Sequence, residues 1–321
     1  MENLPFHKYI RSAEDLVTTK AQALRSWSLL AFARENCRLA SSYVEEAKVL
    51  KWLASKFANP MDLLESSDLR KALLTCSGIP EEWQKQLTEE DKTLAIKGFI
   101  YEFLLPTVER FPDELAYRYL LTKGDALGGK ARNLAGTLGE RKFLRALLSV
   151  LNLAGVHYQW KDANLWHDKK EGDAGIENSL KGLYWSKDSK HRLLILNASV
   201  PTVQKNVDLS LLVGTISDLK KGKESILHDP ARYVALGELK GGFDPAGADE
   251  HWKTANSALN RIKSSFGQLQ LNPHTFFVAA AIENSMATEI FTQLQNRTLS
   301  HAANLTHDEQ LTGVCDWLVN L

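Results

Sequence analysis

Near residue 150 the hydrophobic pattern of the chain changes its period. Before that point apolar residues recur every three or four positions, as in residues 134–151, which is typical of amphipathic helices. After it they gather in short runs with strand character, as in residues 207–213. We therefore predict a mainly helical region over residues 1–150 and an α/β region with a mixed β-sheet flanked by helices over residues 151–321.

Local signals divide both regions further. Ser41-Ser42, between two helical patterns, predicts a break, and the polar stretch of residues 162–178 predicts an exposed loop. The expected elements are, in chain order, helices at 24–39, 43–58, 62–74, 79–87, 93–105, 112–121 and 134–151, strands at 156–160, 182–185, 192–198, 207–213 and 232–240, a helix at 248–266, a strand at 275–282, and helices at 287–294 and 308–321.

The composition narrows the class of protein. Hydrophobic residues make up 44% of the chain and charged residues 24%, which allows a sizeable core. No stretch reaches the roughly eighteen apolar residues of a membrane span, and the N-terminus has no signal-peptide pattern, so we expect a cytoplasmic protein with no membrane partner.

Three well-separated cysteines predict reduced thiols rather than disulfides or a zinc site. A net charge of zero argues against DNA binding by bulk positive charge, but it allows a basic groove balanced by acidic surfaces.

A Glu-x-Lys motif, Glu238-Leu239-Lys240, directly follows the apolar run of residues 233–236. In a strand, residues two apart share a face, so Glu238 and Lys240 are expected to point the same way. Upstream, Asp208 lies inside another apolar run, where a carboxylate is costly to bury unless something binds it. Two carboxylates suit Mg²⁺, and a nearby lysine can orient water or stabilise negative charge. The set predicts a metal-dependent site for phosphodiester hydrolysis, although a lone Glu-x-Lys is also common on exposed strands.

Two further features each leave two interpretations open. His251, at the start of the expected helix 248–266, is either a general base for an attacking water or a helix-surface or hydrogen-bonded core histidine. The glycine-rich residues 124–136 lack the Gly-Lys-Ser/Thr ending of a nucleotide-binding loop. They are either a loop and helix start that contact a DNA backbone, with Lys130 and Arg132 as donors, or a tight connection between helices.

The block of residues 237–256 resembles the AvaI/BsoBI family of type II restriction endonucleases. The resemblance covers nearly the whole chain, through residues 5–6, 14–16, 124–136, 205–208, 279–283 and 302–306. It implies a PD-(D/E)XK nuclease core joined to a helical domain, in a homodimer that encloses double-stranded DNA; the helical region 1–150 would contribute to enclosure and dimerisation. It also implies Mg²⁺-dependent cleavage of a degenerate palindromic six-base-pair site, CYCGRG, with 5′ overhangs, in a bacterial restriction system with a cognate DNA methyltransferase.

The resemblance also implies roles for individual catalytic residues. Carried over position by position, the family's metal-binding acids fall on Asp208 and Glu238, and its catalytic lysine falls on Lys240. Its histidine, the proposed base that activates water, falls on His251, so the resemblance favours the catalytic interpretation of that residue. Whether His251 or Lys240 activates the water stays open.

The same comparison implies DNA contacts. An acid involved in base recognition falls on Asp244, and a carboxylate can accept a hydrogen bond from cytosine N4 in the major groove. A base-contacting lysine of the helical domain has Lys85 as its nearest match. The other expected DNA contacts are basic residues in or near the matching segments: Lys130, Arg132, Lys205 and Lys253. This sequence departs from the family at Ala126, where a polar residue is usual, and in a slightly longer spacing between Asp208 and Glu238.

Two alternative functions remain. A structure-specific or repair nuclease on the same core would smear plasmid DNA or prefer branched substrates. A catalytically silent DNA-binding protein would bind DNA with magnesium present and leave it uncut, but the intact Asp208, Glu238 and Lys240 argue against it.

Overall fold

The computed structural model describes residues 5–19, 21–22, 27–170, 173–242 and 247–321, except for the side chains of residues 27–31 and 131–132. By its contacts the chain divides into two compact units. Leu30–Leu134 form the helical unit, and Met1–Leu29 with Ala135–Leu321 form the sheet unit. This division differs from the expected boundary at residue 150, because the N-terminal segment and the last part of the longest helix belong with the sheet.

The helical unit packs around one apolar core. Its members recur at helical spacing, such as Leu50 and Ala54 in the first long helix and Ile96 and Phe99 in a later one. Its elements are α2 (Trp27–Ala54), η3 (Pro60–Glu65), α3 (Arg70–Cys76), α4 (Glu81–Gln84), α5 (Glu89–Phe99), the π-helical η4 (Ile100–Leu104), η5 (Leu105–Arg110) and the first part of α6 (Phe111–Leu153).

Two expected breaks prove to be helical. Ser41 and Ser42 lie inside α2, where their hydroxyls each donate to a backbone carbonyl of the preceding turn at 2.9 Å. Residues 124–136 lie inside α6, so the expectation of a loop with a helix start and that of a tight connection between helices are both wrong, while DNA contact by Lys130 and Arg132 stays a prediction. Glycine costs a helix only about 1 kcal/mol relative to alanine, and packing of the apolar helix face outweighs such local preferences.

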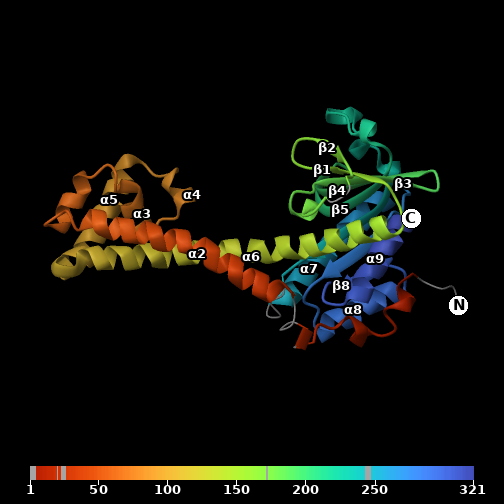
Figure 1. Ribbon diagram of the computed structural model, residues 1–321, viewed down its shortest axis with the longest axis horizontal. Helices are drawn as coiled ribbons and strands as arrows, with labels where there is room; N and C mark the ends of the chain where they lie inside the picture. The colour runs from red at the N-terminus through yellow and green to blue at the C-terminus, as the bar shows by residue number, and fades with distance from the viewer. Residues whose placement is uncertain (1–4, 20, 23–26, 171–172, 243–246) are drawn as a thin grey trace. The chain divides into compact units, whose positions relative to one another are not determined.

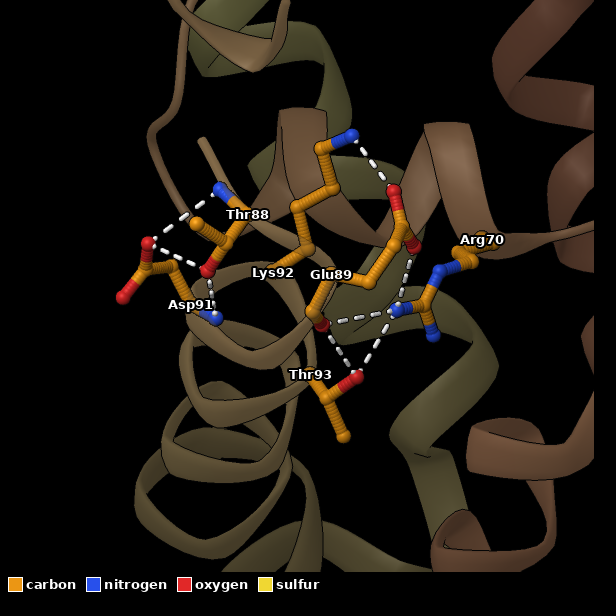
Figure 2. Close-up of polar contacts among 6 residues, drawn as sticks. All are labelled: Arg70, Thr88, Glu89, Asp91, Lys92 and Thr93. Atoms are coloured by element: carbon orange, nitrogen blue, oxygen red, sulfur yellow. Dashed lines mark hydrogen bonds and ion pairs between the residues drawn. The ribbon is translucent and has the colours of Figure 1, made fainter. Parts of the chain in front are cut away.

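Side-chain hydrogen bonds fix where α5 begins (Figure 2). The Thr88 hydroxyl accepts from the backbone N–H of Asp91 at 3.2 Å, and the Asp91 carboxylate accepts in return from the Thr88 hydroxyl at 2.6 Å. Arg70, the first residue of α3, donates to the Glu89 carboxylate at 3.1 Å and to the Thr93 hydroxyl at 2.7 Å. These contacts cap α5 and tie it to the start of α3.

In the described part of the chain, eight strands form one sheet in the order β2-β1-β3-β4-β5-β6-β7-β8. Neighbours from β2 to β6 pair antiparallel, whereas β6, β7 and β8 run parallel. This mixed sheet confirms the predicted fold class. The strands are β1 (Tyr158–Lys161), β2 (Trp166–Asp168), β3 (Gly182–Lys187), β4 (Lys190–Val200), β5 (Lys205–Val213), β6 (Tyr233–Lys240), β7 (His274–Ala279) and β8 (His301–Asn304).

Two of these strands were not expected. β2 lies within residues 162–178, whose polar composition predicts an exposed loop. β8 has only four residues, and all four are buried, so its sequence shows no alternation of polar and apolar positions. Both are placed by pairing with a longer neighbour, β2 with β1 and β8 with β7.

Helices cover both faces of the sheet (Figure 1). α7 and α8 bury their apolar sides in one core, which includes Trp252 and the β7 residue Phe277. The last part of α6 and α9 contribute to a second core, which includes Leu147 and Phe276. Because consecutive β7 residues point to opposite faces, the two cores lie on opposite sides of the sheet. The helices are α7 (Ala248–Gly267), α8 (Asn284–Gln295) and α9 (Asp308–Asn320). Among the described residues, no helix has the length and apolar character needed to cross a membrane.

The N-terminal segment is held at the ends of β7 and β8. The Thr18 backbone N–H donates to the carbonyl of Ile282 at 2.9 Å, and its hydroxyl donates to the carbonyl of Ala280 at 3.0 Å. The buried Asn304 amide donates to the Leu16 carbonyl at 2.9 Å. These bonds explain why this segment belongs to the sheet unit. The remaining short helices are η1 (Pro5–Lys8), η2 (Ala13–Leu16), η6 (Ile176–Asn178), η7 (Ile216–Asp218), η8 (Gly222–Glu224), η9 (Ile226–His228) and η10 (Pro230–Arg232).

Candidate active site

The carboxyl end of β6 lies beside the start of β5, and the Glu-x-Lys motif meets Asp208 there. The last registered pair between the two strands is Leu209–Gly237, so Asp208 and Glu238 are the next residues on either strand. On its other side β6 pairs with β7, where Lys240 lies opposite Ala279. The sheet thus places three sequence-predicted residues together, although 30 positions separate Asp208 from Glu238 in the chain.

One ammonium group bridges the two carboxylates. Lys240 Nζ donates to Glu238 Oε2 at 2.7 Å and to Asp208 Oδ2 at 3.1 Å. The same Asp208 oxygen accepts the backbone N–H of Leu239 at 2.9 Å. Glu238 is 4% exposed, whereas Asp208 and Lys240 are half-buried. The charges therefore interact in surroundings that screen them less than bulk water does.

The pKa values of Glu238 and Lys240 are both raised above their ordinary values. Burial and the negative charge of Asp208 raise the pKa of Glu238 to about 7, and the Lys240 ammonium offsets only part of this rise. For Lys240, burial lowers the pKa, but the charges of Asp208 and Glu238 outweigh burial and the net shift is upward. At neutral pH Lys240 is therefore a cation and a hydrogen-bond donor, and Glu238 lies near its titration point.

The donor set fits Mg²⁺. Asp208 and Glu238 offer the hard carboxylate oxygens that this ion prefers, and Mg²⁺ usually takes one or two protein carboxylates and keeps water and phosphate oxygens. A divalent cation would stabilise the ionised form of Glu238, which burial disfavours. Among the described residues, no three His, Cys, Asp or Glu side chains are grouped to hold a metal.

His251 lies close to Gly242, two positions past the end of β6. It belongs to the first turn of α7, and a methyl group on Gly242 would lie 3.3 Å from its Nε2, with one on Gly247 at 3.6 Å. The His251 side chain is exposed. The next residue, Trp252, is buried and donates from Nε1 to the Glu289 carboxylate of α8 at 2.6 Å. α7 is thus anchored to α8 directly beside an accessible imidazole.

Gly241 allows the chain directly after β6 to pack closely against α6. A methyl group on Gly241 would lie 2.6 Å from the backbone oxygen of Gly136 and 2.9 Å from the Cα of Gly139. Only glycine fits such an approach. The contact brings α6 against the residue after Lys240, and it was not foreseen because it joins segments about a hundred positions apart.

The expected DNA contacts of the sheet unit do not all lie within the described residues. Lys205 is the first residue of β5 and is exposed, three positions before Asp208. Lys253 is exposed on α7 and forms an ion pair with Asp249 at 2.5 Å. Asp244, the expected base-recognition residue, lies outside the described residues.

The other expected DNA contacts belong to the helical unit and the long helix α6. Lys85 is exposed and is the C-cap residue directly after α4. Lys130 is exposed on α6 and donates from Nζ to the Tyr43 hydroxyl at 2.6 Å. Arg132 belongs to α6, but its side chain lies outside the described residues. Both positions therefore belong to a helix rather than to a glycine-rich loop.

The chain matches known proteins along almost its whole length. A family model described as Restriction endonuclease BsobI matches residues 6–321. The chain is 46% identical over 320 residues to a protein named Type II restriction enzyme AvaI from Nostoc sp. (strain PCC 7120 / SAG 25.82 / UTEX 2576), a match that covers 99% of this chain and 100% of the relative. An AvaI from Anabaena variabilis matches equally. Type II restriction enzyme BsoBI from Geobacillus stearothermophilus is 44% identical over 322 residues, with 99% and 98% covered.

Proposed function

The chain belongs to the restriction endonuclease BsobI family, and from this premise we propose that it is a type II restriction endonuclease, which hydrolyses phosphodiester bonds of double-stranded DNA at a specific sequence. The single observation that carries the catalytic part of the proposal is the bridge from Lys240 to both Asp208 and Glu238. It brings two oxygen ligands for a divalent cation and one positive charge to the carboxyl end of β6.

Asp208 and Glu238 would hold Mg²⁺ in this proposal. When bound, the ion polarises the scissile phosphate and lowers the pKa of a coordinated water. Both carboxylates extend from paired strands rather than from mobile loops, so backbone hydrogen bonds define their positions. The raised pKa of Glu238 makes ion binding compete with protonation near neutral pH.

Lys240 and His251 then take different roles. The raised pKa of Lys240 keeps it protonated, so it is suited to orienting water and stabilising phosphate charge rather than to accepting a proton. His251, exposed in the first turn of α7 and close to Gly242, is the proposed base. In the proposed step the water oxygen bonds to phosphorus, an imidazole nitrogen of His251 takes the water proton, and the bond from phosphorus to the 3′ oxygen breaks.

Sequence recognition is proposed to follow the symmetry of the protein. A homodimer with two-fold symmetry matches a palindrome, and we propose a degenerate site resembling CYCGRG that is cut to leave 5′ overhangs. Asp244 is the proposed reader of cytosine N4. If it has this role, Asp244→Ala will cut additional sequences that differ at one base pair, whereas an unchanged set of cut sites contradicts it.

The basic residues are proposed to bind the DNA backbone or base edges. Lys85 is the proposed base contact of the helical unit, which would also contribute to enclosing DNA and to the dimer. The proposed phosphate contacts are Lys130, Arg132, Lys205 and Lys253. Removing one phosphate contact weakens binding to all sequences alike and reduces its salt dependence. The enzyme would act in the bacterial cytoplasm beside a DNA methyltransferase that protects the same site.

A digest of plasmid and genomic DNA tests the proposal. With Mg²⁺ present, purified protein is expected to give discrete fragments whose sequenced ends share one palindromic site. A smear, or preference for branched DNA, would indicate a structure-specific or repair nuclease instead. Tight binding of DNA that stays uncut would indicate a catalytically silent DNA-binding protein.

A further inference from the structure

Asn197 has a backbone conformation that is unusual in the middle of a strand. Its φ is 50°, in the left-handed region, although it lies inside β4. Asparagine adopts this region more readily than other residues with a β-carbon, and β-branched residues are the least compatible with it. Such a conformation costs free energy and persists only where its surroundings impose it, so its position in the fold is informative.

Asn197 lies directly opposite Asp208. The registered pairs on either side are Leu196–Leu209 and Ala198–Val207, which leaves these two residues facing each other across β4 and β5. The pairing continues in the same register beyond them, so Asn197 is not an inserted residue. The unusual backbone therefore changes the direction of side chains at this position without shifting the strands.

In both strands, the alternation of side chains between the two faces of the sheet reverses at this pair. In a regular strand, residues two apart share a face. In β5, however, Leu209 packs in one core and Val207 in the core on the other side of the sheet. In β4 the even-numbered Leu196 and Val200 are likewise divided between the two cores, on either side of Asn197. The pleat is thus reversed at Asn197 and Asp208.

The reversal coincides with the direction of the Asp208 carboxylate. The backbone N–H of Leu239, on the neighbouring strand, donates to this carboxylate at 2.9 Å, and backbone amides of a sheet lie in its plane. Asp208 therefore reaches sideways toward β6 instead of pointing into either core. On the other side of the pair, Asn197 Nδ2 donates to Glu140 Oε2 of α6 at 3.1 Å, next to the residue Gly139 that packs on Gly241.

We propose that Asn197 is a positioning residue for Asp208: its left-handed backbone reverses the pleat of β4 and β5 so that the Asp208 carboxylate lies in the plane of the sheet, beside Glu238 and Lys240. Its functional consequence rests on the proposed role of Asp208 in holding Mg²⁺. The hydrogen bond to Glu140 holds the side chain against α6, but the backbone conformation is what positions the carboxylate.

Substitutions that separate backbone from side chain test this inference in the full chain. Asn197→Gly keeps access to positive φ and removes the amide, whereas Asn197→Val opposes positive φ. The same two substitutions at Ser189 are the control for the general cost of such changes. Ser189 has a φ of 62° and lies in the turn between β3 and β4. The measurements are hydrogen exchange of the Leu239 amide, and the Mg²⁺ concentration for half-maximal cleavage.

The expected result is that Asn197→Val speeds exchange of the Leu239 amide and raises the required Mg²⁺ concentration about tenfold, while Asn197→Gly stays near wild type. Ser189→Val should change neither the exchange of the Leu239 amide nor the required Mg²⁺ concentration. If Asn197→Val does not fold, Asn197→Ala gives the same comparison with a smaller effect.

Equal losses in the glycine and valine variants would overturn the proposal, because they would assign the role to the amide side chain. No change in the valine variant would also overturn it. If wild-type protein neither needs Mg²⁺ nor cuts DNA, the proposed function fails, and the exchange of the Leu239 amide still decides the inference about the backbone.

Discussion

Lys240 donates to the Glu238 carboxylate across 2.7 Å, and the two residues are two positions apart on one face of β6. The pair is unequal, because Glu238 is buried while Lys240 retains some exposure. Burial raises the pKa of the acid toward neutrality, and the charges of the two carboxylates raise that of the base. The burial and the charges of this pair therefore affect the stability of the protein and its dependence on pH.

The stability of the metal-free protein should fall as pH rises from about 4.5 to about 7. Folded Glu238 has a pKa of about 7, above the ordinary value of 4.5, so in this window the folded state binds more protons than the unfolded state. The contribution is fully present below pH 4.5 and is lost as pH passes 7. Urea unfolding across this range should show a steeper decline for wild type than for Glu238→Gln. Equal slopes would contradict the raised pKa.

Lys240→Met should destabilise the protein at pH 8 by about 1–3 kcal/mol, because the buried Glu238 and the half-buried Asp208 lose their shared cation. Lys253→Met is the matched control, since its ammonium pairs with Asp249 on the exposed side of α7 and should matter little. Urea unfolding of both variants measures the difference. Similar losses in the two would show that the bridge adds no stability beyond that of a surface ion pair.

Gly241→Ala should lower the free energy of unfolding by about 1–3 kcal/mol, because the added methyl would meet backbone atoms of α6 that cannot rotate away. Gly267→Ala, in the last turn of α7, has no neighbour within 4 Å and should gain about 0.5–1 kcal/mol from helix propensity. Thermal or urea unfolding checks both. Comparable effects of the two substitutions would argue against the close packing at Gly241.

His251→Gln should slow single-turnover cleavage about 10²- to 10⁴-fold while leaving the Mg²⁺ requirement unchanged, as expected for the loss of a general base that does not bind the metal. His228→Gln, at an exposed residue that ends η9, is the control and should cut normally. A rise in the Mg²⁺ requirement with no change in the maximal rate would assign His251 to the metal site instead.

The three charged residues could be found from the sequence because their signals are local. The two-residue period of a strand relates Glu238 to Lys240, and an acid in an apolar run marks Asp208. The expected strands near both motifs agree with β5 and β6 to within a few residues. Pairing of the two strands then brings the carboxylates together, which periodicity by itself cannot show.

Other features depend on contacts between separate elements of the fold. The contact of Gly241 with Gly139 and the pairing of Asn197 with Asp208 join elements whose sequences carry no mark of each other. The same reason explains why the breaks expected at Ser41-Ser42 and at residues 124–136 are helical. Local preferences of serine and glycine are weak, and packing decides the outcome.

The most direct test of the site is single-turnover cleavage of a duplex that carries the mapped recognition sequence, by wild type and by Glu238→Gln at saturating Mg²⁺. The substitution keeps the shape of the side chain and removes the charge that would bind the ion. We predict that the variant binds the duplex within a few-fold of wild type and cleaves it at least about a hundredfold more slowly. Cleavage by Glu238→Gln at the wild-type rate would contradict the assignment of this cluster as the active site.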